Sequence, residues 1–185
     1  MKVCWVVADN TILDHTVDLE QLKNVGSVWG SWKTWRNCGT DNAICNEIGQ
    51  ARDLIKRGFQ TKCNFYVPKS LFVDLDRPDN VKLYAGEFTF EIDCPEEVIA
   101  LNLVASNFDI VLLLGFDWTE KPKLEDRLLE HRAHNYRLAI DNVITDNPDT
   151  QWVLVNHPGK VSKALSKKDN LTQDTLENVL AMLDA

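Results

Sequence analysis

The sequence predicts an α/β fold, a three-layer Rossmann-like sandwich whose mostly parallel sheet has about five or six strands. Three short apolar runs, residues 2–7, 109–114 and 150–155, are rich in leucine and β-branched residues and lack polar alternation. Strands that helices cover on both faces have this composition. Segments typical of strands and helices alternate along the whole chain without a repeat or a flexible linker, so we expect one domain over residues 1–185.

Further strands are predicted where short apolar runs meet turn residues. In chain order, the predicted strands are residues 2–7, 25–29, 62–67, 81–85, 109–114 and 150–155. Residues 88–92 alternate between apolar and polar side chains, which indicates a half-exposed hairpin arm or sheet edge. The order of the strands in the sheet does not follow from the sequence.

The helices are predicted from apolar spacing and from capping residues. A short turn is expected within residues 14–22. The next helix is expected to start at Thr40 or Asp41 and to end at Gly58, because residues 44, 48, 51 and 55 share one face. A deeply packed helix is expected over 98–105 and a long one over about 123–145. A closing helix is expected to be capped by Thr172.

The chain is acidic, with a net charge of −8, which argues against broad binding of nucleic-acid phosphates unless a local basic patch exists. No signal-peptide core or membrane-spanning run is visible, so a cytoplasmic protein without a membrane partner is expected. The five cysteines contain no C-x-x-C pair, and reduced, mostly buried thiols are therefore expected rather than disulfides or a zinc site.

Polar residues follow the three inner strands directly. Asp9 follows the first, Asp117 follows the second after Gly115, and His157 follows the third. Ligands of parallel α/β sheets gather at the carboxyl ends of the strands. We therefore predict Asp117, His157 and Asp9 as candidate catalytic residues, with His157 for proton transfer and the carboxylates for polar or cation contacts. The alternative is that each is an ordinary turn or capping residue.

Two other groups could border the same cleft. Trp118 offers a flat face beside Asp117. His131 and His134 are three residues apart on the long helix, whose first turns could overhang the strand ends and face a ligand. A solvated charged face is the alternative for the histidines. The H-E-x-x-H arrangement of a metal site is absent, and no metal is predicted.

The segment 29–39 contains three tryptophans interleaved with cationic residues. Trp32 and Trp35 could stack a base or sugar, while Lys33 and Arg36 hold a phosphate. Alternatively, Trp29, Trp32 and Trp35 form one buried face of a helical turn. Neither phosphate-binding glycine motif occurs, so the segment alone does not identify a nucleotide site.

Two segments carry a resemblance to a known family: NVGSVWGSWKTWRNCGTDN over residues 24–42 and DIVLLLGFD over residues 109–117. Through them the chain resembles a family of small proteins of T4-like marine bacteriophages. The resemblance covers most of the chain. It implies a protein made inside an infected bacterium, in the host cytoplasm, and it implies no activity and no catalytic residues.

Two hypotheses follow. The first is a site for a nucleotide-like or phosphorylated small molecule at the strand carboxyl ends, with transferase or hydrolase chemistry. The second is a non-enzymatic module that binds a host protein through an exposed Trp-rich segment. The sequence does not decide whether the protein is an enzyme, and it identifies no cofactor and no oligomeric state.

Overall fold

The computed structural model describes residues 1–8, 18–84, 96–116, 127–156 and 165–183. Eight strands in this described part form one sheet, in the order β5-β4-β3-β2-β1-β6-β7-β8, and each neighbouring pair is parallel. The strands are β1 Val3–Val7, β2 Ser27–Ser31, β3 Asn42–Ile44, β4 Asn64–Pro68, β5 Val81–Tyr84, β6 Ile110–Leu114, β7 Gln151–Val155 and β8 Leu171–Asp174. The predicted α/β fold is confirmed, with more strands than the five or six expected.

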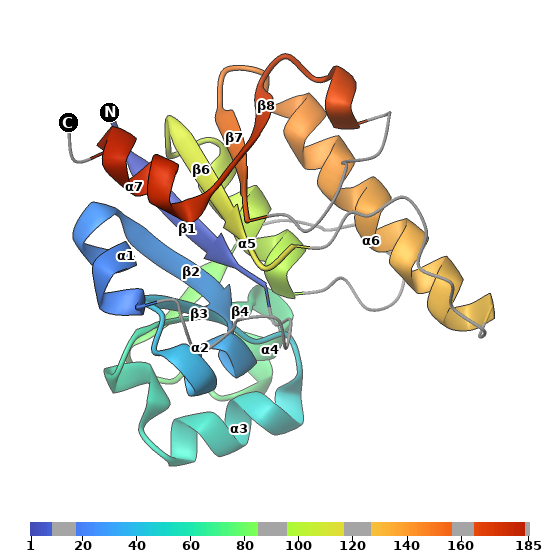
Figure 1. The fold of residues 1–185 in the computed structure, drawn as a ribbon. Helices are drawn as coiled ribbons and strands as arrows, with labels where there is room; N and C mark the ends of the chain where they lie inside the picture. The colour runs from blue at the N-terminus through green and yellow to red at the C-terminus, as the bar shows by residue number, and fades with distance from the viewer. Residues whose placement is uncertain (9–17, 85–95, 117–126, 157–164, 184–185) are drawn as a thin grey trace.

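Helices cover both faces of the sheet, which gives the predicted three layers (Figure 1). The helices are α1 Leu19–Val25, α2 Trp32–Cys38, α3 Ile48–Lys56, α4 Lys69–Asp74, α5 Glu96–Ala105, α6 Arg127–Asp146 and α7 Leu176–Leu183, with short 3-10 turns at Phe59–Thr61 and Leu165–Lys167. Helices α5 and α6 pack on one face, and α1, α2, α3, α4 and α7 pack on the other.

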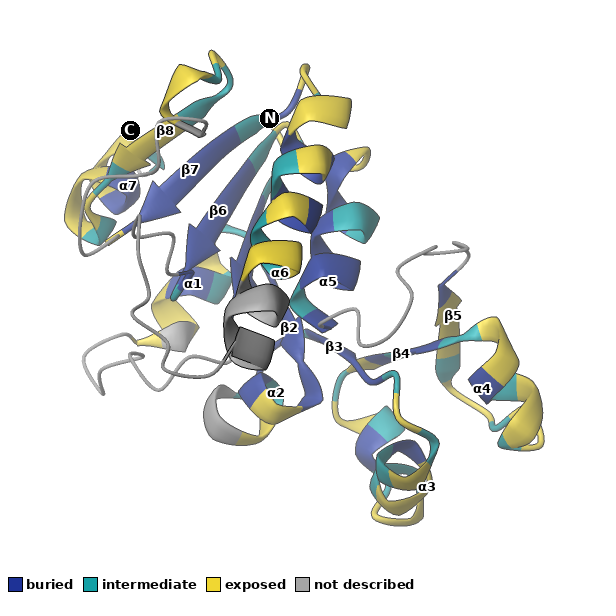
Figure 2. Ribbon diagram, turned by 90° about the vertical axis from the view of Figure 1, so that its right-hand side faces the viewer, coloured by how far each residue is buried: buried dark blue, intermediate teal, exposed yellow. Residues whose placement is uncertain are grey.

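The alternation of side chains along each strand explains the two layers of core. Trp5 and Val7 of β1 pack with α1 and α7, whereas Cys4 and Val6 pack with α5 and α6. Both sets are fully buried, because successive side chains of a strand point to opposite faces. Figure 2 shows the resulting continuous buried region through the central strands and α5, the helix predicted to be deeply packed.

The predicted helix start at Thr40 or Asp41 is wrong. Residues Asn42–Ile44 form strand β3, and α3 begins only at Ile48. Asn42 belongs to the sheet because its amide nitrogen donates to Ser27 Oγ at 2.8 Å and its amide oxygen accepts from Asn64 Nδ2 at 3.0 Å. The helical spacing of Ile44 with residues 48, 51 and 55 was therefore a coincidence of the pattern. Gly58 does adopt the predicted left-handed conformation, with φ of 71°.

The predicted cap at Thr172 is also wrong. Thr172 lies within edge strand β8, and α7 begins at Leu176. The hydroxyl of Thr175 accepts from the N–H of Asn178 at 3.3 Å and caps the helix in its place. A polar four-residue edge strand of this kind lacks the apolar run that identified the inner strands.

Smaller differences concern short elements. Helix α4 was not expected from the sequence, and α1 begins five residues after the start of the turn expected over 14–22, with Asp18 accepting from Glu20 N at 3.0 Å as its cap. Strand β2 starts two residues later than the run expected over 25–29. The hairpin arm or sheet edge predicted over residues 88–92 lies outside the described residues.

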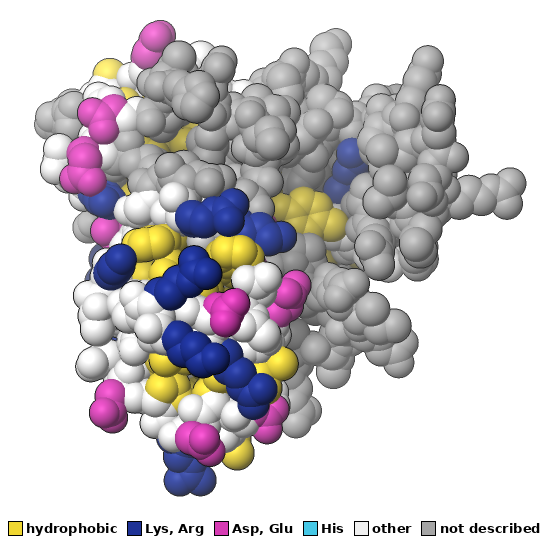
Figure 3. Space-filling model, turned by 90° about the horizontal axis from the view of Figure 1, so that it is seen from below, with side chains coloured by type: hydrophobic (Ala, Val, Ile, Leu, Met, Phe, Trp, Pro, Cys, Tyr) yellow, Lys and Arg dark blue, Asp and Glu magenta, His cyan; other side chains and the backbone are white. Residues whose placement is uncertain are grey.

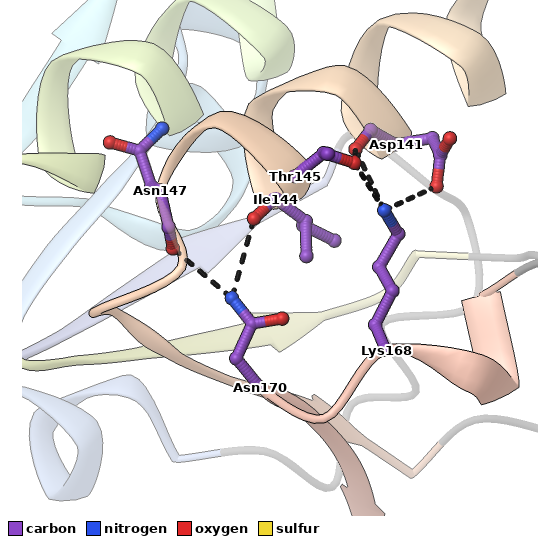
Figure 4. Close-up of polar contacts among 6 residues, drawn as sticks. All are labelled: Asp141, Ile144, Thr145, Asn147, Lys168 and Asn170. Atoms are coloured by element: carbon purple, nitrogen blue, oxygen red, sulfur yellow. Dashed lines mark hydrogen bonds and ion pairs between the residues drawn. The ribbon is translucent and has the colours of Figure 1, made fainter.

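The carboxyl end of α6 is held by side chains from the segment that leads into β8 (Figure 4). The amide of Asn170 donates to the carbonyl oxygens of Ile144 (3.3 Å), Asn147 (3.1 Å) and Thr150 (3.2 Å). Lys168 forms an ion pair with Asp141 at 2.9 Å and also donates to the hydroxyl of Thr145. A cation and amide donors at this position satisfy carbonyls that the helix itself leaves without a partner.

Replacing Asn170 by alanine should remove these contacts and leave helix-end carbonyls without a protein donor. We expect Asn170→Ala to lower the free energy of unfolding by about 1–2 kcal/mol, measured by urea denaturation. Asn178→Ala, which removes an exposed side-chain contact to Asp174, is the control and should cost less. An Asn170→Ala variant as stable as the wild type would show that water replaces the amide at no cost.

Candidate ligand site at the carboxyl-terminal edge of the sheet

The strand order changes direction between β1 and β6. Strand β1 pairs with β2 on one side and with β6 on the other, with Val7 in register with both Gly30 and Leu114. The chain leaves β1 toward α1 on one face and leaves β6 toward α6 on the other. Because the two connections diverge, the carboxyl ends of β1 and β6 form the switch point of the strand order, the position where doubly wound sheets bind ligands.

The backbone at the carboxyl ends of β1 and β6 is close-packed. The N–H of Ala8 donates to the carbonyl of Leu114 at 2.9 Å, so the β1–β6 pairing continues to the very end of both strands. Gly115 follows with φ of 79°, a conformation that residues with a side chain rarely adopt. A Cβ atom there would lie 3.5 Å from the carbonyl oxygen of Ala8. Gly115 thus permits a left-handed backbone conformation directly after β6.

The three inner strands that carried the site prediction are neighbours. Val7, Leu114 and Val155 lie in register at the ends of β1, β6 and β7, so these three strands end side by side. Of the residues that follow them, Asp9, Asp117, Trp118 and His157 lie outside the described residues. The adjacency of their strands is established, and the roles assigned to these side chains remain predictions.

Asn156, the last described residue after β7, has a structural role. It adopts φ of 53°, and its side-chain oxygen accepts from the N–H of Leu176 at 2.8 Å. Its own N–H donates to the carbonyl of Asp174 at 3.0 Å. Asn156 therefore fixes the turn after β7 against the start of α7, immediately before His157.

Helix α6 runs past the carboxyl ends of the strands (Figure 1). The length of the helix predicted an overhang at one end and did not decide which. His134 lies on it and is exposed. His131 belongs to the same helix, but its side chain is outside the described part of the structure. A shared ligand of the two histidines is thus a prediction that the structure leaves untested.

The tryptophans of segment 29–39 are packed in the core. Trp32 is 9% exposed, and the ring of Trp35 meets that of Phe59 at 4.0 Å between centroids. Trp29 belongs to β2 and points to the opposite face, with its ring 5.2 Å from that of Tyr66. The alternative prediction, that these tryptophans form one buried face of a helical turn, therefore fits Trp32 and Trp35. Trp29 lies on the other face of the sheet. Little area of the Trp32 ring is left for a base or for a partner protein, and the Trp35 ring is half-buried.

Lys33 and Arg36 lie on the exposed surface of α2 and cover Trp32. Their charged groups are 6.0 Å and 5.7 Å from its ring centroid. A cation over an indole face is attracted by the negative charge density of the ring. Both cations remain available to an anionic ligand, and Lys33, in the first turn of α2, lies close to the carboxyl end of β2.

A buried carboxyl group lies at the same edge of the sheet. Glu96 is the first residue of α5 and is 9% exposed. Its Oε1 accepts from the backbone N–H of Asn46 at 3.0 Å, just beyond the end of β3. This contact fastens the start of α5 to the β3 end and brings an ionisable group to the edge where ligands are expected.

Burial raises the pKa of the Glu96 carboxyl to about 8. The N–H of Asn46 and the charge of Lys33 lower it, and the charges of Glu97 and Glu47 raise it further. Glu96 is therefore largely protonated at neutral pH, unlike an exposed glutamate. A protonated carboxyl beside a lysine can donate a proton to a ligand that the lysine attracts.

Cys45 lies beside this carboxyl and does not supply a nucleophile. Burial raises the pKa of its thiol to about 12, and the negative charge of Glu96 adds to the effect. Its sulfur contacts the carbonyl of Glu47 at 3.6 Å. Since the reactive form of cysteine is the thiolate, Cys45 is a structural residue at neutral pH.

Glu96 was missed in the sequence. Asp93 and Pro95 indicate a helix start in the sequence, but the acidic residues that follow are common in first turns and carry no functional signal there. The contact with Asn46 depends on β3, which was interpreted as part of a helix. Glu96 could have been identified only by knowing that the start of α5 lies next to the end of β3, and the sequence does not give the strand order.

No family model, curated protein or solved structure matches this chain. Within the described ranges, no helix combines the length and apolar character needed to cross a bilayer. The same described residues contain no group of three or more His, Cys, Asp or Glu side chains that could hold a metal ion. The function is therefore argued from the geometry of the sheet edge.

Proposed function

We propose that this protein binds a phosphorylated small molecule, of the nucleotide or nucleotide-sugar kind, at the carboxyl ends of β1 and β6, and acts on it as a transferase or hydrolase. The observation that carries the proposal is the reversal of strand order between these two parallel strands. Sheets of this type bind nucleotides at that position, outside the strand ends.

Charged groups of the described residues support an anionic ligand. The ammonium group of Lys33 and the guanidinium of Arg36 are exposed on α2, the helix that follows β2 at this edge. Glu96 supplies a carboxyl that holds its proton near neutral pH, so it adds little negative charge to repel a phosphate. Asp9, Asp117 and His157 are the further residues proposed to contact the ligand.

A thermal-shift screen of ribonucleoside mono- and triphosphates and nucleotide sugars tests the proposal. A ligand at about 100 times its Kd adds about 2.7 kcal/mol of stability, which raises the melting temperature by several degrees. For a ligand found this way, Asp117→Asn and His157→Ala should each weaken binding at least about tenfold by calorimetry, a loss of about 1.4 kcal/mol.

Asp109→Asn is the matched control, because Asp109 precedes the same strand β6 at its other end and accepts from Lys2 N at 2.6 Å. It should leave the affinity unchanged. The proposal fails if no compound of the screen stabilises the protein, or if Asp109→Asn weakens binding as much as Asp117→Asn does.

A host-protein partner anchored by exposed tryptophans finds no support in the packing of Trp32 and Trp35. The origin implied by the phage resemblance remains a separate expectation and does not enter the argument for a ligand.

A further inference from the structure

An open groove lies at the opposite, amino-terminal edge of the sheet. It has a volume of about 730 Å³ and lies beside the starts of β3, β4 and β5. Asp41, Asn64 and Val81 line it where these three strands begin. The groove is separate from the carboxyl-terminal edge, so it is not part of the ligand site already described.

The groove is basic on an acidic protein. Lys23, Lys62 and Lys82 line it, and Asp41 is the only acidic residue among the described residues of its lining. The carboxylate of Asp41 accepts from the N–H of Val28 at 2.9 Å, and Lys23 pairs with Glu20 at 2.8 Å. Lys62 and Lys82, both exposed, therefore provide most of the local positive charge.

An aromatic ring and two amides accompany the lysines. Tyr66 follows Asn64 by two residues on the same face of β4, and Lys82 lies 5.5 Å from its ring centroid. The ring of Tyr66 is half-buried and packs against Trp29, and Lys82, which lines the groove, is the contact between this ring and the groove. Asn64 and Asn80 add amide groups to the groove. Lysines next to an aromatic ring are the combination on which single-stranded nucleic acids bind.

Further positive charge lies next to the groove on α3. Arg52, Lys56 and Arg57 are exposed on α3 or at its end, and the exposed Asp53 lies among them. Figure 3 shows several Lys and Arg side chains on this face of the molecule, with Asp and Glu side chains among them. Helix α3 alone spans roughly 13 Å at 1.5 Å per residue, which is longer than one phosphate group requires. The extent of the basic surface favours a chain of phosphates over a single small anion.

We propose that this groove and the adjoining α3 surface bind a single strand of nucleic acid through its phosphates, with a base against Tyr66. The net charge of −8 excludes a protein that is basic all over, and it does not exclude a local basic surface of this kind. The negative charge of the rest of the molecule limits the bound stretch of nucleic acid to this local surface.

The test is fluorescence anisotropy with a labelled oligodeoxythymidine of about 12 nucleotides, at about 50 mM salt and then over rising salt. The double variant Lys62→Gln with Lys82→Gln should bind about tenfold more weakly. Its plot of log affinity against log salt should be less steep by roughly 1.4, because each phosphate contact on a single strand contributes about 0.7.

The matched control is Lys2→Gln with Lys167→Gln, which removes the same charge from two other exposed positions. It should leave affinity and salt dependence close to those of the wild type. Competition by inorganic tripolyphosphate should be weaker than competition by unlabelled oligonucleotide, and an abasic strand should bind less tightly than the thymidine strand.

Three results would overturn the proposal. The wild type fails to bind the oligonucleotide at low salt, or both double variants weaken binding equally, or tripolyphosphate and the abasic strand compete as well as the oligonucleotide. None of these results bears on the site at the carboxyl ends of β1 and β6, because that site uses neither lysine.

Discussion

Glu96→Gln should make the protein more stable at and above pH 8 and should flatten the pH dependence of its stability. The folded state holds the Glu96 proton with a pKa of about 8, well above the ordinary glutamate value of 4.5. Between these values the folded chain binds more protons than the unfolded chain, so stability falls as pH rises. The contribution is fully present below about pH 4.5 and is lost once the pH has passed about 8.

One pKa unit corresponds to about 1.4 kcal/mol, and the wild type should therefore lose up to about 4 kcal/mol relative to Glu96→Gln between about pH 5 and pH 8. Glutamine retains an oxygen that can accept from Asn46 N–H, so the contact itself is kept. Urea denaturation at a series of pH values measures the difference.

Glu177→Gln provides the control, since Glu177 is an exposed acidic residue in the first turn of α7. It should follow the wild type at every pH within about 0.5 kcal/mol. Parallel stability curves for the wild type and Glu96→Gln would contradict the buried, protonated state of Glu96 and remove it as a proton donor.

Gly26→Ala should destabilise the fold by about 2–3 kcal/mol. Gly26 joins α1 to β2, and its N–H donates to the carbonyl of Leu22 at 3.0 Å. A Cβ atom there would lie 2.5 Å from the carbonyl oxygen of Val3 and 2.9 Å from its carbon. These are backbone atoms at the start of β1, so the clash can be relieved only by moving the central pair of strands apart.

The comparison is Gly49→Ala, in the first turn of α3, where nothing lies within 4 Å of the added carbon. Because alanine favours the helix and restricts the unfolded chain, this change should stabilise the protein by about 0.5 kcal/mol. Thermal or urea unfolding of the two variants side by side is sufficient. A Gly26→Ala variant with wild-type stability would show that β1 and β2 are not packed as described.

The fold class followed from the sequence because buried parallel strands have a composition that few other elements share. β1, β6 and β7 were recognised as apolar runs without polar alternation, and all are interior strands of the sheet. Strands β3 and β8 were missed for the opposite reason. They are three and four residues long, and their pairing comes from neighbours far away in the chain rather than from local pattern.

The candidate site was predictable in position and only partly in composition. Strand ends that carry Asp9, Asp117 and His157 could be identified from the sequence, and the pairing of β1, β6 and β7 makes those ends adjacent. Glu96 could not be identified, because its burial depends on α5 reaching back to the end of β3. For Trp32 and Trp35, composition alone allowed both an exposed and a packed state, and contacts with distant residues such as Phe59 and Phe65 decide for packing.

The most direct test of the central claim is an amide chemical-shift titration of the labelled protein with a ribonucleoside 5′-monophosphate. The account predicts shifts that cluster on Ala8, Gly115 and Phe116, at the carboxyl ends of β1 and β6. Residues at the amino-terminal ends of the same strands, Lys2 and Asp109, should not respond. Shifts confined to that opposite edge, or no shifts at all, would contradict a ligand site where the strand order reverses.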